Sequence, residues 1–294
     1  MQLSDQQRAF FGTFGFLAFP GLFADEITAI TQAFEEVWQR HGGGHAGKAH
    51  DGTARSALAQ FIEHDERLSA LLDDPRIVGV ASGLLGDDFN FSGSDGNYYV
   101  GDTRWHSDGW RTNGIMHIKM AFYLDPVTAN TGCLRVIPGS FIPDDQFSRT
   151  LQSSIRLLPT ENQVSGNGDP ANGAGQGPWG ITGRQVPAVP LESQPGDLLV
   201  FNHNLKHAAF GGSARRRMFT MNLCQRYPDA LLPELREMIA GGARFWVERA
   251  YGETMVSTAG PERMRHLEQL LANDGHLAEL SRTARETMAE PARG

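Results

Sequence analysis

Cysteine and long apolar runs are both scarce in this sequence. The 294 residues include only two cysteines, Cys133 and Cys224, and neither lies in a C-x-x-C pattern. Two distant cysteines make no disulfide framework, which favours a reducing, cytoplasmic location. No run of about 18 apolar residues exists, so we expect no transmembrane helix. The first residues lack a basic segment followed by an apolar one, so we also expect no signal peptide.

An excess of positive charge is absent as well. The formal net charge is −8, which argues against general nucleic-acid binding, although a local basic cluster could still hold a small anion. Hydrophobic residues make up 40% and charged residues 20%, a composition typical of a globular chain with a sizeable core. No repeat, no linker and no oligomerisation pattern is found, so we predict one domain over residues 1–294.

Hydrophobic periodicity divides this domain into three parts. Helical spacing dominates residues 1–85 and again residues 229–294, whereas short β-branched and aromatic segments dominate residues 86–228. The pattern predicts a mainly β core with helices on both sides in sequence. The expected helices cover 4–12, 24–41, 65–85, 231–240, 261–273 and 275–288, and the expected strands lie within 15–23, 89–101, 114–124, 132–138, 196–203 and 216–227.

Residues 164–183 interrupt the β part with a segment rich in Gly, Asn and Pro. A loop of this length inside a compact domain is usually functional or disordered. One hypothesis is a plain surface loop. The other is a lid over a functional site, with Trp179 as its apolar tip.

The sequence WHSDGW (105–110) is the strongest local signal for a metal site. If it lies on a strand, His106 and Asp108 point to the same face and can reach one ion. An imidazole and a carboxylate suit a borderline divalent metal. An isolated H-x-D pair is weak evidence, because such pairs occur by chance on many protein surfaces.

A second segment, residues 196–219, strengthens the case for a metal. It contains a strand, then His207, then three consecutive arginines, then another strand. Two histidines and one carboxylate on one face of iron(II) leave three positions open, as in non-haem oxygenases. A 2-oxo acid can chelate two of them and leave one for dioxygen. An arginine would bind the distal carboxylate of 2-oxoglutarate through two parallel hydrogen bonds. Spacing alone leaves His203 open as an alternative to His207.

Three ordered segments around this pattern resemble the phytanoyl-CoA dioxygenase family of iron(II)- and 2-oxoglutarate-dependent oxygenases. They are residues 3–37, residues 119–141 with the stretch NTGCLRVIPGS, and residues 195–210 with PGDLLVFNHNLKHAAF. The resemblance covers most of the chain. It implies a double-stranded β-helix, which is a jelly-roll of two sheets, with helices packed outside.

The resemblance also implies roles for particular residues. The metal ligands fall on His106, Asp108 and His207. The arginine that binds 2-oxoglutarate falls on Arg216, which opens the family's pattern in residues 216–220, with its neighbour Arg217 as the alternative. Strand alternation would send these two side chains to opposite faces. Arg215 is a third alternative, and Lys119 is a candidate contact of the co-substrate.

The implied activity consumes 2-oxoglutarate and dioxygen at iron(II) and releases succinate and carbon dioxide. Related halogenases replace the carboxylate ligand with a small residue, so Asp108 favours hydroxylation, desaturation or cyclisation of a small metabolite. Arg104 and Arg111 near the motif suggest an anionic substrate. The alternatives are a cupin-like metalloenzyme that does not use 2-oxoglutarate and a non-catalytic jelly-roll binding protein.

Overall fold

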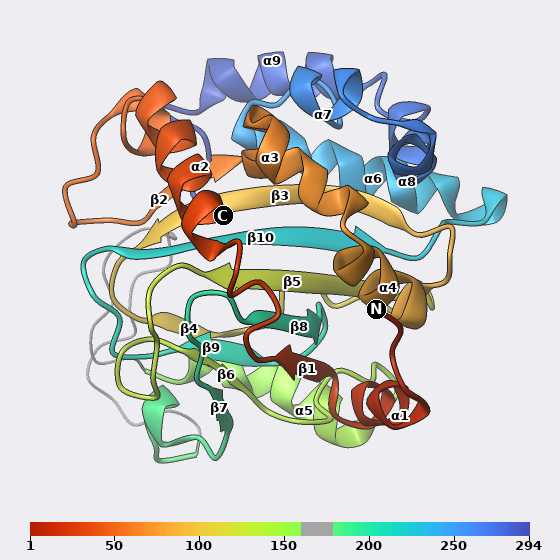
Figure 1. Ribbon diagram of the computed structural model, residues 1–294. Helices are drawn as coiled ribbons and strands as arrows, with labels where there is room; N and C mark the ends of the chain where they lie inside the picture. Colours follow the sequence, from red (N-terminus) through yellow and green to blue (C-terminus); the bar gives the residue numbers. More distant parts are fainter. Residues whose placement is uncertain (160–178) are drawn as a thin grey trace.

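The architecture is a pair of antiparallel β-sheets with helices packed outside, most of them on the larger sheet (Figure 1). It is known from a computed structural model, which describes residues 1–159 and 179–294. The larger sheet has six strands in the order β1-β8-β5-β10-β3-β2, and the smaller has four in the order β4-β9-β6-β7. Sequence neighbours are rarely neighbours in the sheets. This two-sheet arrangement confirms the predicted jelly-roll.

The strands are short, and most begin or end within a few residues of the predicted bounds. The six-stranded sheet consists of β1 (Phe16–Phe19), β2 (Ser56–Ala59), β3 (Asn90–Tyr99), β5 (His117–Tyr123), β8 (Leu198–Asn202) and β10 (Arg216–Cys224). The four-stranded sheet consists of β4 (Thr103–His106), β6 (Leu134–Val136), β7 (Val189–Leu191) and β9 (His207–Ala209).

The two faces of the larger sheet carry different side chains. On β10, Phe219, Met221 and Leu223 join a hydrophobic core with the covering helices, whereas Met218 joins a second core between the sheets. Successive side chains of a strand point to opposite faces, so Arg216 and Thr220 share the inner face with Met218. On β5 the same alternation places Lys119 on the inner face with Ala121. The inner face is therefore where polar and charged side chains meet between the sheets.

Helices from both ends of the chain cover the outer face of the larger sheet (Figure 1). From the N-terminal part come α2 (Ile27–Arg40), α3 (Glu66–Ser69) and α4 (Pro75–Leu85). From the C-terminal part come α6 (Leu232–Ala240), α7 (Glu253–Ser257), α8 (Pro261–Leu271) and α9 (Leu277–Thr287). Two helices lie elsewhere: α1 (Asp5–Phe14) beside β1, and α5 (Gln146–Ser154) under the smaller sheet.

The prediction of one continuous helix over residues 65–85 was wrong. Residues 65–85 form α3, a 3-10 turn over Ala70–Asp73, and then α4, rather than a single helix. Pro75 explains the break, because proline disfavours a helical conformation of the residue before it and fits the first helical position. Asp74 is extended and caps α4 through its carboxylate, which accepts from the Arg76 amide. Helix α5, by contrast, had not been predicted.

Among the residues that the structure describes, no helix is both long enough and apolar enough to span a bilayer.

The lid hypothesis rests mostly on residues 164–178, which lie outside the described residues. Of the described remainder, Trp179 is exposed, and Gly183 opens a short 3-10 helix over Gly183–Gln185.

Candidate metal centre

The two predicted histidine ligands come from neighbouring strands of the smaller sheet. His106 ends β4 and His207 begins β9, and the two residues are direct partners in the antiparallel ladder. Directly opposed side chains in such a ladder start from Cβ atoms only about 5 Å apart. The imidazole ring centroids accordingly lie 4.2 Å from each other. A pairing of strands far apart in sequence thus brings together two histidines separated by 100 residues of chain.

Backbone carbonyls fix the orientation of both rings. The Nδ1 atom of His106 lies 2.7 Å from the carbonyl oxygen of Arg104, and that of His207 lies 2.9 Å from the carbonyl oxygen of Leu205. A carbonyl only accepts, so Nδ1 donates in both cases, and in the neutral ring Nε2 keeps its lone pair. This is how metal-binding histidines are commonly held. Burial, reinforced by the neighbouring His106, lowers the pKa of His207 to about 3, which keeps its ring neutral.

Asp108 completes the cluster from a turn just beyond β4. Its Oδ1 lies 3.7 Å from Nε2 of His106, and its Oδ2 lies 3.6 Å from Nε2 of His207. The expectation that His106 and Asp108 share a strand was wrong, since β4 ends at His106. The chain turns after the strand and returns the carboxylate to the same place. The two-residue spacing brings the groups together through a turn rather than through strand alternation.

These three side chains form a ready-made set of ligands. One ligand atom from each lies within 4.8 Å of the other two, and no other such group occurs in residues 1–159 and 179–294. Two imidazole nitrogens and one carboxylate oxygen, all on one side, fit iron(II) with open positions opposite. His203, the alternative histidine, is buried but is not part of this group.

Lys119 on β5 reaches the carboxylate from the larger sheet. Its Nζ lies 2.9 Å from Oδ2 of Asp108. Burial opposes the charge on both groups, but the Lys119 ammonium nevertheless holds the pKa of Asp108 well below its usual range. In the same way Asp108 and Asp95 outweigh burial and raise the pKa of Lys119. Both groups are therefore charged at neutral pH.

Arg216 points into the space between the sheets. The residue is buried, and its guanidinium carbon lies 5.1 Å from the centre of the Tyr99 ring. The backbones of Gly132 and Gly212 close around it, since an added Cβ on either glycine would lie within 2.4 Å of Nη1. Neither Nε nor Nη1 finds a hydrogen-bond partner in the part of the chain that the structure describes. A buried guanidinium with two unpartnered nitrogens has the chemistry to bind an anion.

The two neighbouring arginines point elsewhere. Arg217 lies on the outer face, where it pairs with Asp125 and, at 2.9 Å, with Glu35 of α2. Arg215 also pairs with Glu35, again at 2.9 Å. Both side chains thus tie the start of β10 to the helical layer. The sequence had not indicated Gly132 or Gly212 as parts of the Arg216 site, because their contribution is a close approach of the backbone.

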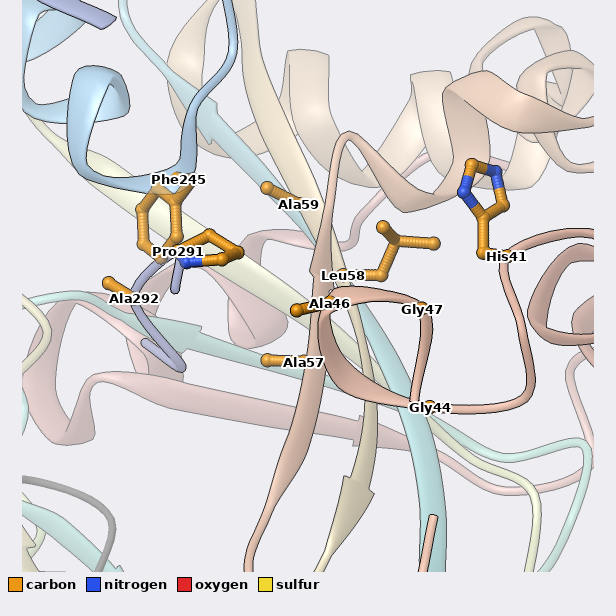
Figure 2. A pocket seen from close by; sticks show the side chains of 10 residues that line it. All are labelled: His41, Gly44, Ala46, Gly47, Ala57, Leu58, Ala59, Phe245, Pro291 and Ala292. Carbon is orange, nitrogen blue, oxygen red and sulfur yellow. The ribbon is translucent and has the colours of Figure 1, made fainter. Parts of the chain in front are cut away.

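A separate depression of about 160 Å³ lies at the turn before β2, between that strand and the C-terminal tail (Figure 2). Its lining consists mainly of small residues with Leu58, Phe245 and Pro291, and His41 is the single titratable side chain among them. None of the three clustered metal-ligand candidates lines it. The chemistry therefore belongs between the sheets.

Comparisons with known proteins agree with this geometry. The family model for phytanoyl-CoA dioxygenase (PhyH) matches residues 11–219, so the chain belongs to the phytanoyl-CoA dioxygenase family. No curated protein matches the sequence significantly. Family membership defines the enzyme as an iron(II)- and 2-oxoglutarate-dependent oxygenase, rather than a cupin-like metalloenzyme without 2-oxoglutarate or a non-catalytic binding protein.

Solved structures share the fold at low sequence identity. The carbocyclase SnoK from nogalamycin biosynthesis is 19% identical, with a TM-score of 0.54 over 76% of this chain and 84% of its own. EctD from S. alaskensis with bound iron is 20% identical, with a TM-score of 0.53 over 76% of both chains. HygX from Streptomyces hygroscopicus, with nickel and 2-oxoglutarate bound, is 14% identical, with a TM-score of 0.53 over 77% of this chain and 89% of its own.

Proposed function

We propose that His106, Asp108 and His207 hold the iron of this oxygenase and that the enzyme oxidises a small metabolite. The carrying observation is the convergence of the three ligand atoms within 4.8 Å of one another. It is supported by the carbonyl contacts that leave both Nε2 atoms available. Bound iron(II) would supply the site at which dioxygen and the 2-oxo acid react. The protein would orient the reactants, exclude water from the site and neutralise the charge of the carboxylates.

The proposed anchor of 2-oxoglutarate is Arg216. Its guanidinium is buried and shares the inner face with Lys119, and its Nε and Nη1 atoms have no hydrogen-bond partner among the described residues. A dicarboxylate that chelates iron at one end would supply the missing acceptor at the other end. Arg217 is unsuited to the role because Asp125 and Glu35 already neutralise it on the opposite face.

Lys119 is proposed to position Asp108 rather than to bind the co-substrate directly. Its ammonium occupies one side of Oδ2, which leaves Oδ1 beside His106 as the freer oxygen. Such a contact would hold the carboxylate as a single-oxygen ligand and offset its charge. Groups that orient metal ligands commonly change metal affinity by 10–100-fold.

The proposed overall reaction inserts one oxygen atom of dioxygen into a C–H bond of the substrate. The other oxygen atom enters succinate while carbon dioxide leaves 2-oxoglutarate. Asp108 favours this outcome, or the related desaturation or cyclisation, because the carboxylate occupies a position that a halide would need. An anionic substrate is proposed from the cationic residues near the motif, Arg104 and Arg111.

We further propose that all three parts of the chain form one catalytic domain over residues 1–294. The hydrophobic core over the outer face contains Leu3, Phe91 and Leu277, which come from the N-terminal, central and C-terminal parts. A core shared in this way makes the helical ends structural supports of the sheet. The sheet in turn carries Lys119 and Arg216.

The ligand assignment is tested by anaerobic titration of the metal-free protein with iron(II). Wild type is expected to bind one equivalent, and His207→Ala to bind at least about 100-fold more weakly, since losing a metal ligand exceeds the effect of losing its hydrogen-bond support. The matched control is His203→Ala, which removes a buried histidine four residues away and is expected to keep iron binding. Loss in His203→Ala with retention in His207→Ala would overturn the assignment.

A further inference from the structure

A second polar cluster lies on the inner face of the larger sheet. It starts at the level of Lys119 and extends away from Arg216. On β5, His117 precedes Lys119 by two residues and so points to the same face. On β10, Asn222 is the direct partner of Lys119, and Arg216 lies six residues earlier. The order along the sheet is therefore Arg216 at one end, the Lys119–Asp108 pair with Asn222 between, and His117 at the other end.

His203 joins the cluster from the chain just after β8. Its amide donates to the carbonyl of His117 at 3.0 Å, and the ring centroids of the two histidines lie 5.6 Å apart. Both residues are more than nine-tenths buried. Burial lowers the pKa of His203 to about 4 and that of His117 well below its usual range, with the nearby Arg111 guanidinium lowering both further. The two rings are therefore neutral at pH 7, with a cation beside them.

Two buried polar atoms in this cluster, Nδ1 of His117 and Nε of Arg111, lack hydrogen-bond partners among the described residues. Nε2 of His203 and Oδ1 of Asn222 also lack a partner at full hydrogen-bond geometry, but these two side chains interact with each other. The second lone pair of Oδ1 is left for a ligand. Buried polar atoms without a partner destabilise a fold, so their gathering in one cluster beside the proposed metal ligands requires an explanation. Such a group is explained by a ligand that supplies the partners.

The rest of the structure holds these atoms in place. The Asn222 amide nitrogen donates to the carbonyl of Gly93 at 3.3 Å, which leaves Oδ1 for another partner. The Tyr227 hydroxyl forms a hydrogen bond of 2.8 Å with Nε2 of His117, which leaves Nδ1 of that ring for another partner. The Asn204 side chain bonds both the amide and the carbonyl of Arg111, each at 2.9 Å. The cluster is therefore preorganised rather than collapsed on itself.

We propose that His117, His203, Asn222 and Arg111 bind a hydroxycarboxylate group of the substrate. This inference deepens the proposed function, on which it rests for the position of the metal. The carboxylate accepts from the Arg111 guanidinium and an imidazole N–H, and the neighbouring hydroxyl donates to Oδ1 of Asn222. An amine in place of the hydroxyl would bring a second cation to Arg111, so an amino acid fits less well. The opposite end, at Arg216, is left to 2-oxoglutarate.

The test uses zinc-loaded full-length protein with bound 2-oxoglutarate and ¹⁵N-labelled histidine. The probes are glycolate and its uncharged amide, glycolamide, which match in size and differ in charge. Glycolate is expected to shift the ring nitrogens of His117 and His203, and glycolamide to leave them in place. His117→Asn and His203→Asn assign the two sets of resonances.

Variants separate the cluster from general anion binding. Arg111→Gln is expected to weaken glycolate binding about tenfold or more, as for loss of a charge-assisted hydrogen bond. Arg111→Lys is expected to retain part of it. The matched control is Arg226→Gln, which removes a surface arginine paired with Glu268 and should leave binding unchanged.

Three outcomes would overturn the inference. They are no shift of either ring with glycolate, equal shifts with both probes, and glycolate binding that survives Arg111→Gln. Iron(II) and 2-oxoglutarate binding is measured separately on the same preparation. If that binding is intact while glycolate has no effect, the hydroxycarboxylate inference fails and the proposed function stands.

Discussion

Neighbouring arginines at the start of β10 have opposite surroundings, and strand alternation is the reason. Arg216 enters the space between the sheets and finds aromatic and glycine neighbours. Arg217 turns to the helices and finds Asp125 and Glu35. Chemically identical side chains one residue apart thus become a candidate anion site and a structural ion pair. The resemblance favoured Arg216 over Arg217 from the sequence, and the different burial of the two faces is what supports this preference in the structure.

Room around the Arg216 guanidinium depends on glycine. A Cβ on Gly212 would lie 2.3 Å from the carbonyl oxygen of Gly101 and 2.4 Å from Nη1 of Arg216, so both the backbone and the guanidinium would have to move. Gly212→Ala is therefore expected to displace the guanidinium and weaken 2-oxoglutarate binding about tenfold or more, with iron(II) binding kept. Anaerobic titration with each ligand measures both. Gly275→Ala is the control, because a Cβ there meets nothing within 4 Å. Unchanged 2-oxoglutarate affinity in Gly212→Ala would contradict the proposed anchor.

At the scale of elements, the sequence predicted the strands better than the turns and helix breaks that separate the elements. The strands β3, β5, β8 and β10 lie within the predicted segments because alternation and flanking turn residues mark them locally. The break at Pro75 was overlooked because the apolar spacing continues across it. Helix α5 was missed because its apolar face is short. Asp108 was wrongly expected on β4, which ends at His106. A turn can bring two side chains two residues apart to the same place, just as a strand does.

The metal cluster was predictable as a set of residue types and not as a geometry. H-x-D and a later histidine suffice to suggest a triad. The direct cross-strand pairing of His106 with His207 depends on the register of β4 against β9, which no local pattern encodes. The same holds for the Lys119–Asp108 contact, which joins the two sheets.

Glu63 links the elements of the outer layer and makes their packing depend on pH. It lies in a 3-10 helix over Phe61–His64 and accepts from the amide of Gly252, the N-cap of α7, at 2.7 Å. Ser94 of β3 lies 3.5 Å from its other oxygen. Burial raises the pKa of Glu63 to about 8. The folded protein therefore holds a proton that the unfolded chain releases near the ordinary pKa of 4.5.

Because the folded pKa is the higher one, this contribution to stability is complete below about pH 4.5 and is lost as pH rises toward 8. Glu63→Gln keeps a neutral side chain and is expected to remove that loss. Its free energy of unfolding relative to wild type should rise between pH 5 and 8 by up to about 1.4 kcal/mol per pH unit. Urea denaturation across this range measures it. A difference that does not vary with pH would contradict a neutral Glu63 in the fold.

At the scale of the whole molecule, both ends of the chain share the core on the outer face of the larger sheet. Leu235, Met255, Leu267 and Leu277 from the C-terminal part pack with Phe91 of β3. The helices that contribute these residues cover the sheet that carries Lys119 and Arg216 on its other face (Figure 1). The sequence predicted helices at both ends of the chain. That both sets of helices pack on the same face of the larger sheet depends on long-range contacts, which local sequence patterns do not encode.

Removing residues 229–294 is expected to abolish cooperative folding, because it exposes the outer face of the larger sheet. Thermal unfolding followed by circular dichroism measures this, with the full chain as reference. A truncated chain that melts cooperatively and still binds iron(II) would show that the C-terminal helices are a separate unit. It would contradict the single-domain proposal.

The most direct measurement of the central claim is anaerobic. Iron(II)-loaded protein is mixed with 2-oxoglutarate, and the weak visible charge-transfer band of a chelated 2-oxo acid is recorded for wild type, Arg216→Ala and Arg217→Ala. The account predicts the band in wild type and in Arg217→Ala, and a much weaker band in Arg216→Ala at the same concentration. Bound iron without a band in wild type, or a band that depends on Arg217 and not on Arg216, would contradict it.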